Sequence, residues 1–159
     1  GFAKDGKNIT EENIEKIKSQ LEKERAGAFV SIHKEGSLRG CIGTISAVRK
    51  NIAEEIIENA ISASSKDPRF NPIMADELPY LEITVDILGD KEPIESPDDL
   101  DVKKYGVIVT KGMHRGLLLP NLDGVDTVEE QLSIAKQKAG LSPYEDECLL
   151  ERFEVVRHY

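Results

Sequence analysis

The stretch AFVSIHKEGSLRGCIGTI, residues 28–45, decides the fold class of this chain. Two apolar runs, Ala28 to Lys34 and Leu38 to Ile45, flank the turn residues Glu35-Gly36-Ser37. Apolar runs of this length around a glycine-containing turn are typical of a β-hairpin. The sequence therefore predicts two antiparallel strands at this point.

Helical periodicity flanks this hairpin and returns later in the chain, together with further strand patterns. Apolar residues recur at helical spacing in some segments and alternate with polar ones in others. The expected elements are a helix capped by Thr10 and running to about Arg25, a helix from about Asn51 to Ser65, a strand over Leu81 to Ile87, a hairpin formed by Tyr105 to Thr110 and Arg115 to Leu119, a helix capped by Thr127 with Glu130 and ended by Gly140, and a strand from Arg152 to Arg157. This mixture predicts the α+β class.

The chain also repeats itself at an offset of 76 residues. The shift superposes glycines and arginines of the two hairpins and apolar residues of the helices that follow, among them Gly36 on Gly112, Arg39 on Arg115, Gly40 on Gly116 and Ala63 on Ala139. Two copies of a hairpin-helix unit explain this match. The alternative is that any two such units share turn glycines.

Length, charge and cysteine usage limit the possible functions. A chain of 159 residues fits one domain, expected over 10–159, with residues 1–9 as a linker or an expression remnant of a longer polypeptide. Thirty acidic residues against twenty-one basic ones give a charge of -9, which disfavours nonspecific nucleic-acid binding. No apolar run predicts a membrane span, and no leader predicts secretion. Cys41 and Cys148 form neither a disulfide framework nor a metal spacing, so we expect a cytoplasmic protein without a metal or other cofactor.

The register of the first hairpin determines which side chains share a face. A three-residue loop pairs His33 with Arg39 and Ser31 with Cys41, and it groups these four polar side chains on one face. Val30, Ile32, Leu38 and Ile42 then form the opposite, apolar face. A two-residue Gly36-Ser37 turn would instead place Cys41 opposite Ile32. The cleaner separation of apolar from polar residues favours the first register.

Cys41 is the candidate nucleophile, and His33 is a candidate general base. A neighbouring cation such as Arg39 favours the reactive thiolate form of a cysteine. The alternative is that Cys41 is a small buried hydrophobic residue, as free cysteines often are.

The remaining candidates are binding residues. Gly40 and Gly43 allow either close approach of a ligand to the backbone or a bend in the strand. In the segment Asp67-Pro68-Arg69-Phe70, Asp67 and Arg69 either form a turn or bind a ligand. Arg115 repeats the position of Arg39, so the two guanidiniums either bind one anion in a shared cleft or form surface salt bridges.

Three of these segments together carry a resemblance. Leu38-Arg39-Gly40-Cys41-Ile42-Gly43, Asp67-Pro68-Arg69-Phe70 and Arg115-Gly116-Leu117-Leu118-Leu119-Pro120 resemble the AMMECR domain family, whose prokaryotic members are called AmmeMemoRadiSam system protein A. The likeness runs from about Ala26 to the last residue. It implies an α+β fold in which duplicated hairpin-helix units share one curved, mostly antiparallel, barrel-like sheet with flanking helices.

The sequence differs from those of many similar proteins at two places. Many of them have Gly-Trp-Asp where this chain has Gly124-Val125-Asp126, and they often have a cysteine at the position of Lys136. Similar proteins of anaerobic bacteria look like the C-terminal part of a longer chain that begins with a Memo-like domain of the dioxygenase fold. A radical S-adenosylmethionine protein often accompanies them. The resemblance thus implies partners but no reaction.

Two functional hypotheses follow. In the first, the chain handles an anionic substrate of a modification pathway, with Cys41 as the reactive thiol and Arg39, Arg69 and Arg115 as anion-binding groups. In the second, the arginine-glycine segments belong to a noncatalytic interaction module. Whether the chain is an enzyme depends on the surroundings of Cys41.

Overall fold

Helices alternate with antiparallel strands along the chain, as the sequence predicts. The computed structural model describes residues 11–159. The expected cap at Thr10 and the expected linker at 1–9 therefore lie outside the described residues. The elements are α1 (Glu11–Lys23), β1 (Ala28–Lys34), β2 (Ser37–Gly43), α2 (Ile52–Ser65), the 3-10 helix η1 (Ala75–Tyr80), β3 (Leu81–Leu88), β4 (Glu92–Ile94), the 3-10 helix η2 (Pro97–Asp99), β5 (Gly106–Lys111), β6 (His114–Leu118), α3 (Val128–Lys138), β7 (Leu149–Phe153) and β8 (Val155–His158).

The chain divides into two units. Unit 1 has two segments, the chain up to Leu88 and the stretch Val156–Tyr159. Unit 2 is the continuous stretch Gly89–Val155 between them. Each unit has a four-stranded sheet, with the order β2-β1-β3-β8 in unit 1 and β4-β7-β5-β6 in unit 2. All the strand pairs whose register is known are antiparallel.

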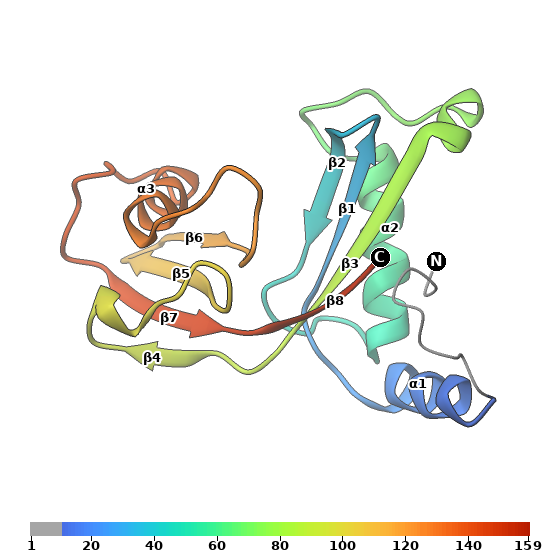
Figure 1. Ribbon diagram of the computed structural model, residues 1–159, viewed down its shortest axis with the longest axis horizontal. Helices are drawn as coiled ribbons and strands as arrows, with labels where there is room; N and C mark the ends of the chain where they lie inside the picture. Colours follow the sequence, from blue (N-terminus) through green and yellow to red (C-terminus); the bar gives the residue numbers. More distant parts are fainter. Residues whose placement is uncertain (1–10) are drawn as a thin grey trace. The chain divides into compact units, whose positions relative to one another are not determined.

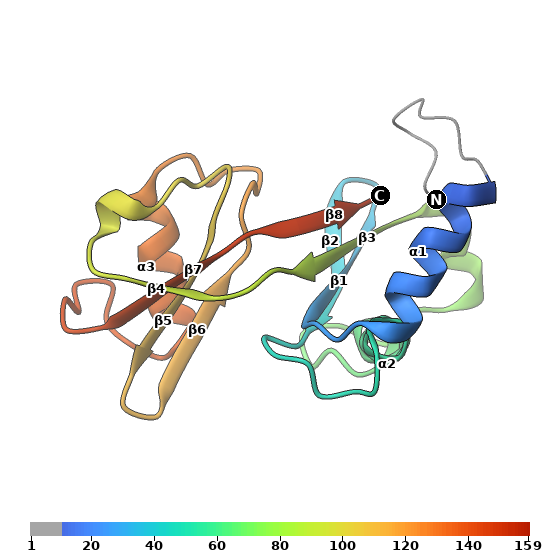
Figure 2. The same cartoon turned by 90° about the horizontal axis from the view of Figure 1, so that it is seen from below.

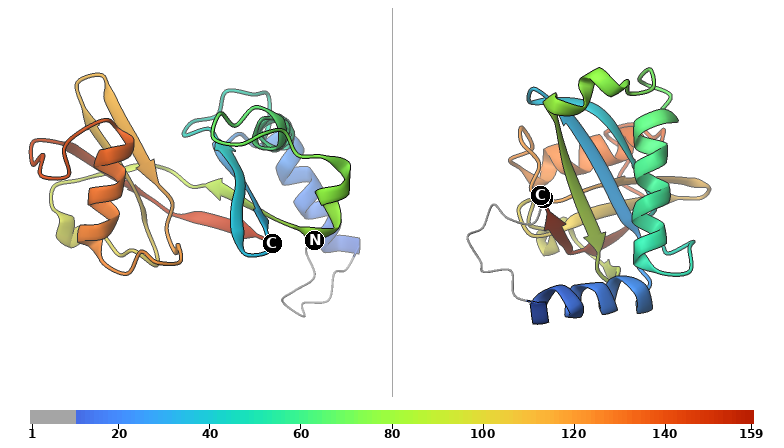
Figure 3. Two further views of the ribbon diagram at one scale, coloured as in Figure 1. Left: turned by 90° about the horizontal axis from the view of Figure 1, so that it is seen from above. Right: turned by 90° about the vertical axis from the view of Figure 1, so that its right-hand side faces the viewer.

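In unit 1, α2 covers one face of the sheet (Figure 1; Figure 3, right). It packs on β1 and β2. Val30, Ile32 and Ala63 form the buried centre, and the partly buried residues around them are Ile42, Ile56, Ala60, Ile73, Leu81 and Val85. The helix begins where the side chain of Asn51 accepts a hydrogen bond from the backbone N–H of Glu54 at 2.9 Å. Strand β8, seen in Figure 2, is the edge strand next to β3, at the edge of the sheet away from β2.

Unit 2 repeats the local arrangement with a richer apolar core. Its helix α3 packs on β5 and β6, and Val107, Val109, Leu118, Leu132 and Ala135 are among the buried side chains between them. The predicted cap is confirmed, because the hydroxyl of Thr127 accepts the N–H of Glu130 at 3.1 Å. The predicted helix end is confirmed as well, because Gly140 adopts φ +79 just beyond α3.

The two hairpins and their helices lie where the 76-residue offset places them. The offset also relates one close contact: a Cβ atom on Gly40 would collide with the carbonyl of Ala63, and one on Gly116 would collide with the carbonyl of Ala135 and with Ala139. In both units the missing side chain allows the helix to approach its edge strand. A common origin of the two units stays a prediction.

The α+β class is confirmed, but the expected single barrel-like sheet is not found. The strands of residues 11–159 form two separate sheets, and neither closes on itself. The prediction of one continuous last strand, from Arg152 to Arg157, is also wrong. The strand is interrupted at Glu154, so that β7 joins the sheet of unit 2 and β8 joins the sheet of unit 1.

Candidate functional site

The sheet of unit 1 has a polar face on the side opposite α2. Along β1, Val30 and Ile32 face the helix, so the alternating residues Ser31 and His33 face away from it. The antiparallel register with β3 adds three side chains on this side. The polar side chains of this polar face are Ser31, His33, Cys41, Glu82, Thr84 and Asp86, and they share it with Phe29 and Leu38.

The turn of the first hairpin is shorter than predicted. Glu35 and Gly36 both have positive φ, at 51 and 84, which is the conformation of a two-residue hairpin turn. Lys34 therefore pairs with Ser37, and His33 pairs with Leu38. The predicted pairing of His33 with Arg39 is wrong.

A β-bulge at Arg39 then shifts the register by one residue. Ile32 pairs with Gly40 and Ser31 with Cys41, so the second predicted pairing is confirmed although the turn differs. The bulge exchanges two expected positions. Leu38 is opposite His33 and 40% exposed rather than in the core, and Arg39 lies in the bulge, where its guanidinium binds Glu77.

Arg39 binds a carboxylate that sequence reasoning missed. Its Nε and Nη2 donate to the two oxygens of Glu77 in η1 at 3.0 and 3.1 Å, and Nη1 donates to the carbonyl of Asn71 at 2.8 Å. Lys34 also reaches Glu77, at 3.1 Å. The hydrogen bonds from Arg39, from the backbone of Met74 and from Lys34 lower the pKa of Glu77 from 4.5 to about 2. Arg39 thus anchors the segment that leads from α2 to β3.

Cys41 is held through its backbone at the edge of the sheet. Its N–H donates to Oδ2 of Asp67 at 3.0 Å, and its carbonyl accepts from Nη2 of Arg69 at 3.1 Å. A strand at a sheet edge has backbone groups without a strand partner, and these two side chains satisfy both of them at Cys41. The half-buried thiol lies on the polar face, with Sγ 3.4 Å from Oγ of Ser31.

Asp67 and Arg69 form the turn that the sequence predicts, and they also bind each other. The carboxylate of Asp67 is buried and accepts from the backbone N–H, Nε and Nη2 of Arg69 at 3.0, 3.0 and 2.8 Å. These bonds, with the N–H of Cys41, hold the pKa of Asp67 well below its usual range. Asp67 is therefore a carboxylate at neutral pH, and its charge is balanced by Arg69.

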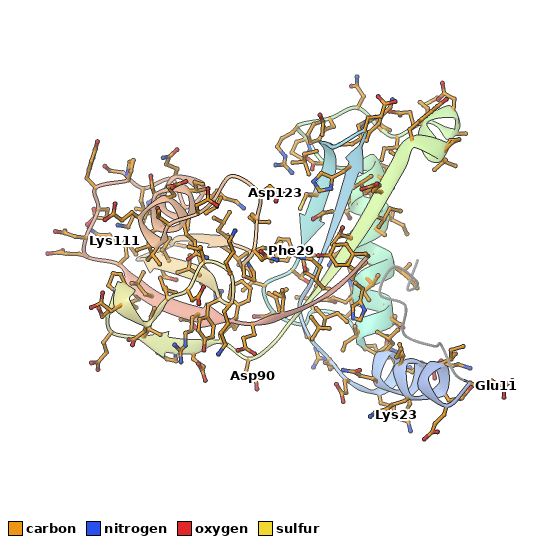
Figure 4. All side chains as sticks on the ribbon, viewed as in Figure 1. Glu11, Lys23, Phe29, Asp90, Lys111 and Asp123 are labelled. Carbon is orange, nitrogen blue, oxygen red and sulfur yellow. The ribbon has the colours of Figure 1, made fainter. Side chains whose placement is uncertain are left out.

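Packing accounts for both predicted binding glycines. Gly40 allows α2 to approach β2, and a Cβ atom on Gly43 would collide with the ring of Phe29 (labelled in Figure 4). Ligand binding at Gly43 stays a prediction. For Gly40 the bulge at Arg39 lies next to the helix contact.

Arg115 lies in unit 2, whereas Arg39 lies in unit 1. Nη2 of Arg115 is 3.8 Å from Oε1 of Glu151, and the side chain is 41% exposed. This geometry is that of a surface ion pair, which was one of the two alternatives. A cleft shared with Arg39 stays a prediction.

A buried ion pair on the polar face was missed. Asp86 is 1% exposed, and its Oδ1 accepts from Nε of Arg157 in β8 at 2.7 Å. Burial raises the pKa of Asp86, and Arg157 opposes that rise. The alternation of Glu82, Thr84 and Asp86 with apolar residues was a signal for a polar face, but no local pattern linked Asp86 to Arg157.

Within residues 11–159, no three His, Cys, Asp or Glu side chains gather in a way that could hold a metal ion. None of the helices in that part of the chain is both long and apolar enough to cross a membrane.

Comparison with known proteins agrees with the resemblance. Residues 3–158 match the family model described as AMMECR1. The chain belongs to the AMMECR1 family. A family relative from Thermotoga maritima is 54% identical over 145 residues, which cover 91% of this chain and 83% of that protein. The crystal structure of an uncharacterized protein from Pyrococcus horikoshii matches with a TM-score of 0.80 and 31% identity, over 97% of this chain and 81% of that one.

Another family relative is much longer. A protein from Clostridium acetobutylicum is 52% identical over 153 residues, which cover 94% of this chain but only 32% of that protein. The chain thus spans about a third of that relative, whereas it spans most of the protein from Thermotoga maritima.

Proposed function

We propose that unit 1 handles an electrophilic substrate through the thiol of Cys41 on the polar face. The observation that carries this proposal is the double anchoring of Cys41 by Asp67 and Arg69, which fixes its backbone on both sides. Catalytic groups need such support, because a reactive side chain must be held in position before the substrate arrives.

The residues around Cys41 in the segment 38–43 have structural roles that hold the thiol in place. Gly40 seats β2 on α2, Gly43 accommodates Phe29, and Arg39 anchors the segment with Glu77. Packing and ion pairs therefore occupy the neighbours of Cys41. The half-buried thiol itself lies 3.4 Å from the hydroxyl of Ser31, and we propose that it is the reactive group of the motif.

Two of the predicted anion-binding arginines have a further role in this proposal. Arg39 and Arg69 already bind Glu77 and Asp67, so we assign both guanidiniums to the support of Cys41. An anionic substrate group would have to compete with these carboxylates. The proposed chemistry is nucleophilic attack by the thiolate of Cys41, with the thiol proton passing to His33.

The proposed pathway setting rests on chain length and on the resemblance. The relative from Clostridium acetobutylicum has about two thirds of its length outside the matched region, which provides room for a further domain. A Memo-like domain and a radical S-adenosylmethionine protein are the partners that we propose for this pathway.

Alkylation of the folded protein tests the proposal. Iodoacetamide is applied at pH 7 under reducing conditions, and mass spectrometry follows Cys41 and Cys148 separately. We expect Cys41 to react faster in the folded chain than in the urea-unfolded chain, whereas Cys148 should react more slowly when folded. Absence of labelling at Cys41 in the folded protein would refute a reactive thiol.

A noncatalytic interaction module is the second candidate. It is favoured by apolar side chains in and beside η1, where Met74 and Leu78 are 64% and 62% exposed. The two candidates are separated in a host that lacks its own family member. A nucleophile predicts loss of function in Cys41→Ser and none in Leu78→Asp, and an adaptor predicts the reverse.

A further inference from the structure

His33 lies on the polar face between the thiol and a carboxylate. On one side, β2 presents Cys41 two ladder positions away, because Cys41 is opposite Ser31 and His33 is opposite Leu38. On the other side, Glu82 of β3 pairs directly with His33. The three side chains come from three adjacent strands and point to the same face of the sheet.

The register places Glu82 directly opposite His33 on one side and Cys41 beyond the bulge on the other side. Directly opposed residues have Cβ atoms about 4.5–5.5 Å apart, and diagonal neighbours are about 7–8 Å apart, which a long or aromatic side chain can span. His33 is half-buried, and Glu82 is exposed. This order, from thiol to imidazole to carboxylate, is that of a nucleophile, its base and the group that orients the base.

We propose that Glu82 is a positioning residue for Cys41 that acts through His33. In this role the carboxylate would accept a hydrogen bond from one ring nitrogen of His33 during the reaction, which would leave the other nitrogen to take the proton of Cys41. This role rests on the proposed function of Cys41 and extends it to a residue outside the motif. Glu82 stabilises the imidazolium that forms when the thiol proton moves to His33.

Other charges near His33 are already bound elsewhere. The ammonium of Lys34, the next residue on β1, and the guanidinium of Arg39 both bind Glu77. Asp86, on the same face, binds Arg157. The opposite face of β1 is covered by α2, which contributes apolar side chains to the core there. Among these charged groups, Glu82 is the carboxylate that the sheet register places directly opposite His33.

Alkylation provides a reaction whose atoms are all known. The thiolate of Cys41 attacks the methylene carbon of iodoacetamide, an S–C bond forms, the C–I bond breaks and iodide leaves. The thiol proton goes to His33 and then to water. The alkylation rate at pH 7 therefore measures how readily His33 accepts the proton of Cys41, and the natural substrate need not be known.

The sign of the effect distinguishes an indirect role of Glu82 from a direct one. If Glu82 acts through His33, Glu82→Gln weakens the imidazolium and slows alkylation. If its negative charge acts directly on Cys41, it opposes the thiolate, and the same substitution accelerates alkylation. The two mechanisms thus predict opposite changes from one variant.

The experiment is a double-mutant cycle on the full chain, with folding checked by thermal melts. We expect His33→Gln to slow Cys41 alkylation about tenfold and Glu82→Gln about threefold. In the His33→Gln background, Glu82→Gln should no longer slow the reaction, and Glu82→Asp should retain part of the wild-type rate. Glu58→Gln on α2, which removes an exposed partner of Arg49, is the matched control and should change nothing.

Failure of this inference differs from failure of the proposed function. Faster alkylation of Glu82→Gln, or equal slowing with and without His33, would overturn the role of Glu82 while Cys41 stays reactive. If folded wild-type protein does not label at Cys41, the proposed function itself fails.

Discussion

Gly40 of β2 lies directly against the backbone carbonyl of Ala63 in α2, with no room for a side chain between them. A methyl group at this position would have to displace helix backbone rather than a flexible side chain. We therefore expect Gly40→Ala to lower the free energy of unfolding by about 1–3 kcal/mol, the usual cost of overpacking. Gly116→Ala should behave alike in unit 2. Urea denaturation measures both, with exposed Ser37→Ala as the control, and a loss below about 0.5 kcal/mol would contradict the close contact.

Asp67→Asn should destabilise unit 1 at neutral pH. The substitution removes the charge that Arg69 and the N–H of Cys41 bind, and charged hydrogen bonds contribute about 1.5–3 kcal/mol. The folded protein holds the pKa of Asp67 below its ordinary value of 3.8, so this stabilisation is complete above that pH and is lost as the pH falls below it. Denaturation at pH 7 and pH 3 should show a smaller difference between wild type and variant at pH 3. A constant difference would argue against the ion pair.

Glu77→Gln should remove a second contribution to stability that depends on pH in the acidic range. In the folded protein, Arg39 and Lys34 lower the pKa of Glu77 to about 2 from 4.5, so its contribution is present above 4.5 and disappears between these values. We expect the variant to lose stability at pH 7 and to have a flatter stability profile between pH 5 and pH 2. Asp76→Asn, an exposed neighbour in η1, provides the control. Identical profiles for wild type and Glu77→Gln would exclude this anchoring role.

Arg157→Leu should strongly lower the free energy of unfolding when it is made alone, but not when it is combined with Asp86→Leu. Without Arg157, the buried carboxylate of Asp86 has lost its ion pair, and breaking a buried pair in this way costs about 3–5 kcal/mol. Burial raises the pKa of Asp86, so the cost should shrink as the pH falls and Asp86 takes up a proton. The double variant Asp86→Leu/Arg157→Leu should return close to wild-type stability. A double variant as unstable as the single one would mean that the pair itself is favourable.

The sequence predicted the elements of this fold because their signals are local. The hairpin around Gly36 and the helix between Thr127 and Gly140 were confirmed, because turn glycines, caps and apolar spacing act within a few residues. The register near the turn was wrong, because a two-residue turn and a bulge at Arg39 give the same Ser31–Cys41 pairing as a longer loop. Pattern alone does not distinguish these two solutions.

The contacts that build the candidate site could not be predicted in the same way. Arg39 was predicted either to bind an anion or to form a salt bridge, but no local pattern indicated its partner Glu77, which is 38 residues away in sequence. Asp67 and Arg69 were predicted either to form a turn or to bind a ligand, whereas their bonds to Cys41 depend on how α2 returns the chain to the sheet edge. Long-range partners depend on strand order and helix packing, and a local sequence motif predicts neither of these.

The ion pair between Asp86 and Arg157 also has a consequence for the order of biosynthesis. These residues are 71 positions apart, and a ribosome adding about 5–20 residues per second needs roughly 4–14 seconds to travel from one to the other. Until then, the nascent chain presents the carboxylate of Asp86 to water beside a three-stranded sheet. The sheet of unit 2 waits in the same way, because its inner strand β7 comes directly before β8, so both sheets are completed only when residues 149–158 have been made.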